Sequence, residues 1–190
     1  MTSISIIGTG NMGTAIASVL TDGGASVENI GHNDQPSAFG DIVILAVPYT
    51  AVPEIAEKYR DQLAGKTVVD ITNTVDFATF QPVQFDAGSG AAQLAASLPD
   101  AKVIKAFNTN FGPTLSTKTV AGKTTTTVMI AGDDADAKAA LSAAITAGGL
   151  NVLDAGPLAR ARELEALGFL QISAAVTEQI SWTDGIVVVK

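Results

Sequence analysis

The sequence predicts a doubly wound α/β fold, in which helices cover both faces of a mainly parallel sheet. The first observation is a β-branched run, Ser3–Ile7, followed at once by a glycine-rich turn and an apolar helical pattern. The second is the run Asp41–Pro48, whose apolar residues are continuous rather than alternating, as in a central parallel strand. The third is that strand and helix patterns continue to alternate through most of the chain.

The glycine-rich turn has the spacing Gly8-x-Gly10-x-x-Gly13. Gly8 lets the strand turn sharply, Gly10 lets the backbone approach a pyrophosphate, and Gly13 lets the helix pack on the strand. The free N–H groups at the helix start would face the phosphates. An ordinary glycine turn is the alternative, but a strand before and a helix after favour a dinucleotide-binding, Rossmann-type fold. The cofactor-binding residues predicted in this turn are Gly8, Thr9, Gly10, Asn11, Met12 and Gly13.

Composition narrows the class of protein. A chain of 190 residues with 47% hydrophobic and 16% charged residues is expected to form one compact domain with at most a small appendage. A net charge of -8 argues against nucleic acid or an anionic membrane as partner. The absence of cysteine excludes disulfides, a thiolate nucleophile and a cysteine metal site. With no basic leader pattern and no apolar run of membrane length, a cytoplasmic protein is expected.

The end of the predicted second strand, Val27–Ile30, bears on the choice of cofactor. An NAD site places an acid there to accept hydrogen bonds from the ribose. Gly31 stands at that position, and Asp34 follows three residues later. No Arg or Lys is present for a 2′-phosphate, but His32 and Asn33 can donate hydrogen bonds to one. A surface turn is the alternative for these residues. The missing acid favours NADP, with NAD left open.

The connection from the second to the third strand is short. About eight residues around positions 35–40 make a crossover that usually takes a dozen or more. Eight extended residues span up to about 27 Å, and the path needs roughly 22 Å. A truncated crossover without a helix is therefore expected, where a typical dinucleotide fold inserts helix, strand and helix.

The later elements are expected in a regular order. They are a helix at 51–63, a strand at 66–72, a loop or lid at 74–90, a helix at 91–98, strands at 102–106 and 125–131, a helix at 135–147, a strand at 150–153, a helical stretch towards residue 182 and a β-branched tail at 185–190. Residues 1–156 would form the dinucleotide-binding domain, and 157–190 a helical extension of the same structural unit. Asp133 or Asp134 is expected to cap a helix. No metal site is predicted, because no other ligand-rich cluster accompanies these residues and Asp154.

Six stretches of the chain together resemble one family. They are Gly8–Gly13, Ala46–Tyr49, Val69–Asn73, Lys105–Thr109, Ala131–Asp134 and Leu153–Leu158. The chain is similar, over nearly its whole length, to the NADP reductases that use a deazaflavin (coenzyme F420) and to the cytosolic domains of transmembrane metalloreductases. The resemblance implies that the glycine turn binds pyrophosphate and that the ends of strands three to five lie along the nicotinamide half. A Ser-Arg pair would hold the 2′-phosphate, where this chain has His32 and Asn33.

The carboxyl ends of parallel strands meet at the edge of the sheet where ligands bind. The residues expected there, along the nicotinamide half, are Ala46, Val47, Pro48, Tyr49, Thr72, Asn73, Phe107, Asn108 and Gly112. The amides of Asn73 and Asn108 can bind a ribose or carboxamide, with turn formation as the alternative. Tyr49 and Phe107 can wall a flat ring, with core packing as the alternative for Phe107. Lys105 is expected to contact a ligand anion or to be solvated.

The terminal helix carries two apolar stripes. They are Phe169, Ile172, Val176 and Ile180, and Leu164, Leu167 and Leu170. A helix that is apolar on more than one side is expected to pack against its own sheet and against a second surface. A homodimer, with a ligand pocket between the subunits, is the partner that we expect.

These observations predict an NADP(H)-dependent oxidoreductase that passes a hydride between nicotinamide and a flat small-molecule acceptor, such as a flavin, a deazaflavin or a quinone-like ring. Such a transfer needs two stacked rings and no side-chain acid or base. No catalytic residue is assigned. A catalytically silent module that senses the nicotinamide redox state is one alternative. A small carbonyl or imine reductase is another, and it would need a proton donor.

Overall fold

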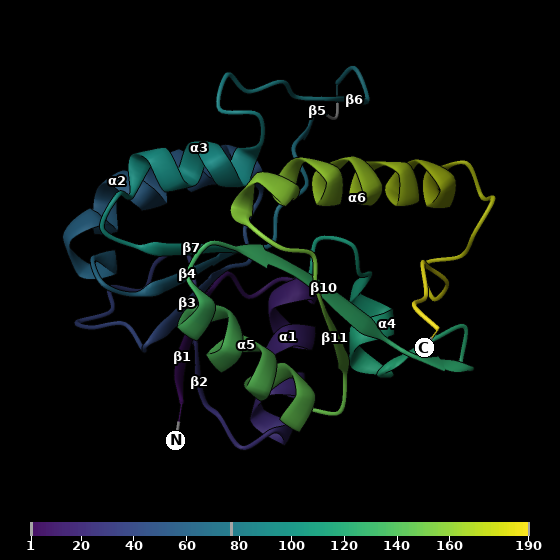
Figure 1. Ribbon diagram of the computed structural model, residues 1–190, viewed down its shortest axis with the longest axis horizontal. Coiled ribbons are helices and arrows are strands. Elements are labelled where there is room, and N and C mark those ends of the chain that lie inside the picture. Colours follow the sequence, from purple (N-terminus) through teal and green to yellow (C-terminus); the bar gives the residue numbers. More distant parts are fainter. Residues whose placement is uncertain (1, 77, 190) are drawn as a thin grey trace.

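A seven-stranded sheet forms the centre of the molecule in a computed structural model that describes residues 2–76 and 78–189 (Figure 1). Its strands lie in the order β11-β10-β7-β4-β3-β1-β2. They are β1 (Ser3–Ile7), β2 (Ser26–Ile30), β3 (Ile42–Leu45), β4 (Thr67–Asp70), β7 (Lys102–Ala106), β10 (Thr127–Gly132) and β11 (Asn151–Asp154). All neighbours are parallel except β7 and β10, which are antiparallel. The predicted mainly parallel, doubly wound sheet is confirmed.

Helices cover both faces of this sheet (Figure 1). They are α1 (Asn11–Asp22), α2 (Val52–Leu63), α3 (Gly90–Ser97), α4 (Gly112–Ser116), α5 (Ala135–Ala147) and α6 (Ala161–Val176), with 3-10 turns η1 (Tyr49–Ala51) and η2 (Leu158–Arg160). One apolar core joins α1, α4 and α5 to the sheet, and a second joins α2, α3 and η2 to its other face. α6 packs over β10 through a third, smaller cluster. No helix among the described residues is long and apolar enough to cross a membrane.

The crossover between β2 and β3 contains no helix, as predicted. Gly40 allows its close approach to β1, because a Cβ there would lie 2.6 Å from the carbonyl carbon of Ser3. The Gly40 amide donates to the Ser5 hydroxyl at 2.9 Å. Phe39 is buried, with its ring 5.1 Å from that of Tyr59. The segment thus contributes one buried aromatic ring to the core on the α2 and α3 face of the sheet, where a longer crossover would place a helix.

Several short elements are not apparent in the sequence pattern. They are α4, the hairpin β5 (Val75–Asp76) and β6 (Gln81–Pro82) within the expected loop, and the hairpin β8 (Thr119–Val120) and β9 (Thr124–Thr125). The last helix ends at Val176, short of Trp182, because Glu178 takes a left-handed φ of 57°. Ile180 therefore lies beyond the helix. The tail forms no strand over 185–189, and Lys190 lies outside the described residues.

The face that α6 turns to the sheet differs from the predicted stripes. It consists of Leu164, Gly168, Gln171 and Ala175, which are all buried. Leu170 is 63% exposed and Val176 is 52% exposed, so these two do not pack against the sheet of their own chain, and the expected packing on a second surface stays a prediction. A glycine and small residues allow α6 to approach the sheet edge closely, and the bulkier residues then lie on the flanks of the helix.

Candidate dinucleotide-binding site

A groove of about 790 Å³ follows the carboxyl ends of β1, β3, β4 and β7. Its lining comes from the glycine turn (Gly10, Asn11 and Met12), from the ends of β3 (46–50), β4 (71–73) and β7 (108 and 110–113), and from Ile172 and Trp182. The predicted residues Ala46, Val47, Pro48, Tyr49, Thr72, Asn73, Asn108 and Gly112 are thus brought together with half of the glycine turn. This is the sheet edge at which open α/β folds bind their ligands.

The three glycines of the turn have different surroundings. Gly8 has a φ of 121°, and a Cβ on it would collide with the carbonyl of Ala46. A Cβ on Gly13 would collide with the carbonyl of Gly8. A Cβ on Gly10 would meet nothing within 4 Å, and no side chain caps the start of α1 there. The backbone at Gly10 is therefore open towards the groove, at the positive end of a twelve-residue helix.

The remaining predicted cofactor residues lie outside the groove lining. Gly8 and Gly13 pack against the backbone beneath the turn, Thr9 is exposed, and Gly31, His32 and Asn33 follow β2. His32 and Asn33 are exposed to solvent. The end of β2 is thus an open surface next to the groove, and the structure does not bring these two side chains into it.

Phe107 does not wall the groove, contrary to the prediction. Its side chain is completely buried in the core beneath the sheet edge, and its φ of 61° turns the chain at the end of β7. Phe111 lines the groove instead, with its ring 4.8 Å from that of Trp182. Trp182 was not among the predicted site residues. Trp182 is the sole tryptophan of the chain, and this was the one feature of the sequence that could have drawn attention to it. The position of the tail cannot be predicted from the sequence.

Asn73 and Asn108 bind each other. The Asn73 Nδ2 donates to the Asn108 carbonyl at 2.7 Å, and the Asn108 Nδ2 donates to the Asn73 Oδ1 at 2.9 Å. The Asn108 Nδ2 also donates to the carbonyl of Leu164 at 2.8 Å. Gly168 packs against both amides, and a Cβ there would collide with them. The Asn108 amide thus ties α6 to the strand ends with both of its N–H groups in use, while its Oδ1 has no partner among the described residues and Asn73 uses one N–H, so the bonds to a ribose or carboxamide stay a prediction.

Lys105 is neither solvated nor in the groove, so both readings of it were wrong. It is fully buried, and its Nζ lies 2.8 Å from the Asp70 Oδ2, 3.0 Å from the Glu165 Oε1 and 2.6 Å from the carbonyl of Thr72. Glu165 of α6 also accepts from the amides of Gly90 and Ala91 at the start of α3. The lysine points across the strands instead of along them, because Asp70 stands beside it on the neighbouring strand.

The lining of the groove contains no Asp, Glu, Lys, Arg or His among the described residues. Tyr49 is the one ionisable side chain in it, and its hydroxyl makes no hydrogen bond to a described residue. The groove can therefore hold an uncharged flat ring between apolar and aromatic side chains, but it offers little acid–base chemistry.

The acidic residues weighed as metal ligands have structural partners. Asp134 caps α5 by accepting from the amide of Ala137 at 2.8 Å, as predicted, and this bond lowers its pKa. Asp133 accepts from the amide of Leu158 at 2.9 Å. Asp154 pairs with Lys138 at 2.8 Å, and that partner holds its pKa below the usual value.

Comparisons with known proteins bear on the family and the fold. Residues 26–74 match the protein family described as NADP oxidoreductase, coenzyme F420-dependent. Metalloreductase STEAP3 of Rattus norvegicus is 33% identical over 180 residues, which are 86% of this chain and 36% of that protein. The chain thus spans about a third of the length of this curated relative.

Two solved structures have a similar fold. One, from Arthrobacter sp. FB24 and described as a candidate F420-dependent NADP reductase, has a TM-score of 0.86 and 23% identity, with full coverage of both chains. The other, hypothetical protein SMa0349 from Sinorhizobium meliloti, has a TM-score of 0.72 and 29% identity, over 84% of this chain and 87% of that one. At 23% identity the first of these shows the fold alone. The family match over residues 26–74 and the curated relative support the resemblance of the sequence motifs to the F420-dependent NADP oxidoreductases.

Proposed function

We propose that this NADP-dependent oxidoreductase holds NADP(H) along the groove and passes a hydride between its nicotinamide and a flat, uncharged acceptor ring. The observation that carries this proposal is the groove itself. Its lining combines the open backbone of Gly10 with the aromatic side chains of Tyr49, Phe111 and Trp182, and its described lining has no charged side chain. The backbone at Gly10 suits a phosphate, and the aromatic side chains suit a flat ring.

The residues of the groove fit a dinucleotide by their chemistry. Gly10 leaves space where a phosphate would approach, and the start of α1 offers N–H groups that no side chain caps. Val47, Ile71 and Ile172 supply apolar walls that exclude water from the ring end. When NADPH is bound it supplies the hydride. The protein's part is to orient the two rings and to keep solvent away from them.

A small carbonyl or imine reductase is the second candidate, and one observation favours it. Tyr49 lines the groove and its hydroxyl has no hydrogen-bond partner among the described residues, so it is the one ionisable side chain there that could supply a proton. The Tyr49→Phe variant separates the two functions. Hydride transfer to a flavin-like ring is expected to keep its rate in this variant, whereas carbonyl or imine reduction would fall by about 100-fold or more.

The exposed apolar residues of α6 support self-association as part of this proposal. Leu170 and Val176 are both exposed, on different sides of the helix, and Val176 lies one turn beyond Ile172, which lines the groove. Burial of these side chains against a second subunit would remove apolar surface from water. A subunit that covered Val176 would lie close to the groove.

The test uses Trp182 as a built-in reporter. It is the sole tryptophan and it lines the groove, so NADPH bound there is expected to quench tryptophan emission and to gain emission itself by energy transfer. Oxidation of NADPH is then followed with riboflavin and with a deazaflavin as acceptors. Energy transfer without turnover of either acceptor would favour the silent redox-sensing module. No energy transfer would refute the proposed groove.

A further inference from the structure

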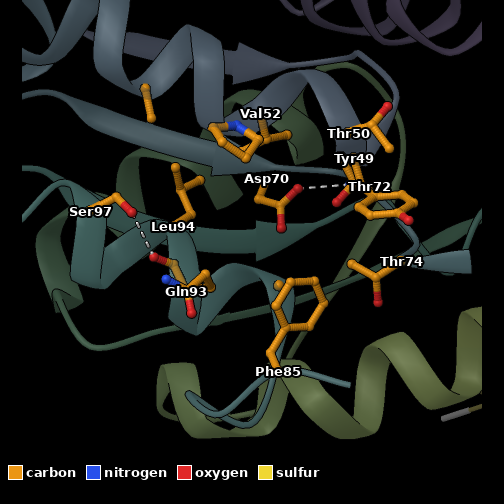
Figure 2. Close-up of a pocket in the computed structure, with 13 residues that line it drawn as sticks. Tyr49, Thr50, Val52, Asp70, Thr72, Thr74, Phe85, Gln93, Leu94 and Ser97 are labelled. Atoms are coloured by element: carbon orange, nitrogen blue, oxygen red, sulfur yellow. Dashed lines mark hydrogen bonds between the residues drawn. The ribbon is translucent and has the colours of Figure 1, made fainter. Parts of the chain in front are cut away.

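A second pocket adjoins the groove, between α2, α3 and the end of β4 (Figure 2). Its volume is about 180 Å³. We propose that this pocket binds an uncharged single heteroaromatic ring that carries N–H donors, and that this ring is one end of the hydride acceptor. The second half of this statement rests on the proposed function, but the pocket can be tested without any nucleotide.

The size and the walls of the pocket suit one ring. A cavity of about 150 Å³ in another protein accommodates benzene. The walls are apolar on three sides, with Val52, Pro53 and Ala56 from α2, Leu94 from α3, and Phe85 from the segment before α3. Figure 2 shows the ring of Phe85 across the pocket from Val52. Burying the faces of a ring between these side chains would supply most of the binding energy.

The polar side chains of the pocket include hydroxyls and the Gln93 amide, which can donate as well as accept, and one carboxylate, Asp70, which only accepts. Asp70 lies at its centre in Figure 2, between Leu94 and Thr72. Its carboxylate takes one bond from the amide of Thr72 at 2.8 Å and one from Lys105 at 2.8 Å, so each oxygen keeps a free lone pair. Thr72 is 6% exposed, and no hydrogen bond to a described residue occupies its hydroxyl, which is not among the fully buried polar atoms and so is accessible from the pocket. The Asp70 carboxylate and the Thr72 hydroxyl can both accept hydrogen bonds in an otherwise apolar pocket, so a ligand with N–H groups would complement them.

The charges around the pocket exclude an anion. Lys105 is the one cation of the buried cluster, and it is shared between two carboxylates, Asp70 and Glu165. The second pocket therefore has a surplus of negative charge beneath it, in a buried environment where charges interact strongly. A ligand carboxylate or phosphate would be repelled, whereas a neutral ring would not.

The pocket and the groove share a boundary. Tyr49, Thr50 and Thr72 line both of them. A ring in the pocket would therefore lie next to the part of the groove that is formed by the ends of β3 and β4. This is where the acceptor must approach if the nicotinamide lies along those strand ends.

The experiment compares two single-ring probes on the nucleotide-free protein by NMR titration. Thymine is a neutral ring with two N–H donors, and orotate is a related ring with an added carboxylate. Thymine is expected to bind about tenfold or more tighter than orotate, which corresponds to about 1.4 kcal/mol. Equal affinities, or tighter binding of orotate, would refute the charge argument and with it the proposed ligand class.

A matched pair of variants on α3 then locates the binding. Ser97 lines the pocket, and its neighbour Ala96 is exposed and does not line it. Ser97→Leu is expected to weaken thymine binding at least tenfold, and Ala96→Leu is expected to leave it within twofold. Unchanged binding in Ser97→Leu, or equal loss in both variants, would refute the site.

The same variants keep this proposal separate from the proposed function. Ser97 does not line the groove, so energy transfer from Trp182 to NADPH is expected to be unchanged in Ser97→Leu. The Michaelis constant for the acceptor should rise in that variant while the dissociation constant of NADPH stays the same. A pocket that binds no ring would leave the dinucleotide groove intact, and an inactive groove would leave thymine binding intact.

Discussion

The carboxylate of Asp34 accepts a hydrogen bond of 2.6 Å from the backbone amide of Gly31 at the end of β2. A Cβ on Gly31 would lie only 3.2 Å from this carboxylate oxygen. The turn thereby returns the acid of residue 34 to the place where an NAD site carries an acid at the strand end. From the sequence alone Asp34 lies too late in the chain for this role. The turn is closed by the bond from the Asp34 amide to the Gly31 carbonyl. It brings residue 34 back to the strand end despite its later place in the sequence.

The first prediction concerns the choice between NADPH and NADH. Asp34→Asn is expected to raise the affinity for NADPH relative to NADH by about tenfold, because a carboxylate near the ribose repels a 2′-phosphate. Asparagine can still accept the bond from Gly31, so the turn should persist. The dissociation constants are measured by energy transfer from Trp182. Asp61→Asn, at an exposed site on α2, is the control, and an unchanged ratio in Asp34→Asn would contradict the role of this carboxylate.

The second prediction separates the glycines of the turn. Gly10→Val is expected to keep the melting temperature of the wild type but to lose NADPH binding, since the position is open and a branched side chain would fill the space of a phosphate. Gly8→Val should instead fail to fold or melt much earlier, because its side chain would meet the carbonyl of Ala46. Calorimetry and NADPH titration on both variants test this. Retained binding in Gly10→Val would count against the groove as the phosphate site.

The third prediction concerns the buried ion cluster. Lys105→Met is expected to lower the free energy of unfolding by about 3–5 kcal/mol, because it leaves Asp70 and Glu165 buried without their cation. The triple variant that adds Asp70→Asn and Glu165→Gln should recover part of this loss. Urea unfolding measures both. A triple variant no more stable than Lys105→Met would show that packing, and not charge, dominates at this site.

The fourth prediction concerns acid stability. Hydrogen bonds lower the pKa of Asp41, from Ser3, and of Asp134, from the amide of Ala137. A carboxyl with a lowered pKa in the folded state stabilises the protein above its unfolded pKa of about 3.9, and this contribution is lost as pH falls through the folded pKa. The urea midpoint should therefore be steady from pH 7 to about 5 and fall below about pH 4. Asp134→Asn keeps a capping side chain but should flatten this fall, and an unchanged slope would contradict the assignment.

The fifth prediction tests self-association. Leu170→Glu combined with Val176→Glu is expected to give a folded monomer, because more than half of each residue's surface is exposed in the single chain. Sedimentation at micromolar concentration compares this variant with the wild type and with Val189→Glu, an exposed apolar residue of the tail, as control. A wild type that sediments as a monomer would rule out the homodimer.

The sequence predicted the parts of the site that depend on backbone geometry and order along the chain. The glycine turn, the convergence of Pro48, Thr72 and Asn108 at one sheet edge, and the crossover without a helix follow from local patterns. The environment of a side chain depends on its neighbours from other strands, which local patterns do not contain. Lys105 lies within β7 and Phe107 directly follows it, yet the first is bound by Asp70 and the second lies in the core. The contribution of Trp182 depends on a tail without regular structure, for which the sequence has no periodic signal.

The shortened crossover also has a consequence for the assembly of the sheet. In the longer dinucleotide folds a further strand pairs with the outer side of the second strand. Here β2 is the outermost strand, and within the described residues its second side pairs with nothing. The unpaired backbone groups of such an edge strand can pair with a strand of another molecule, and charged side chains on the edge strand disfavour that pairing. Glu28, exposed at the middle of β2, is the residue placed to keep separate molecules from adding strand to strand.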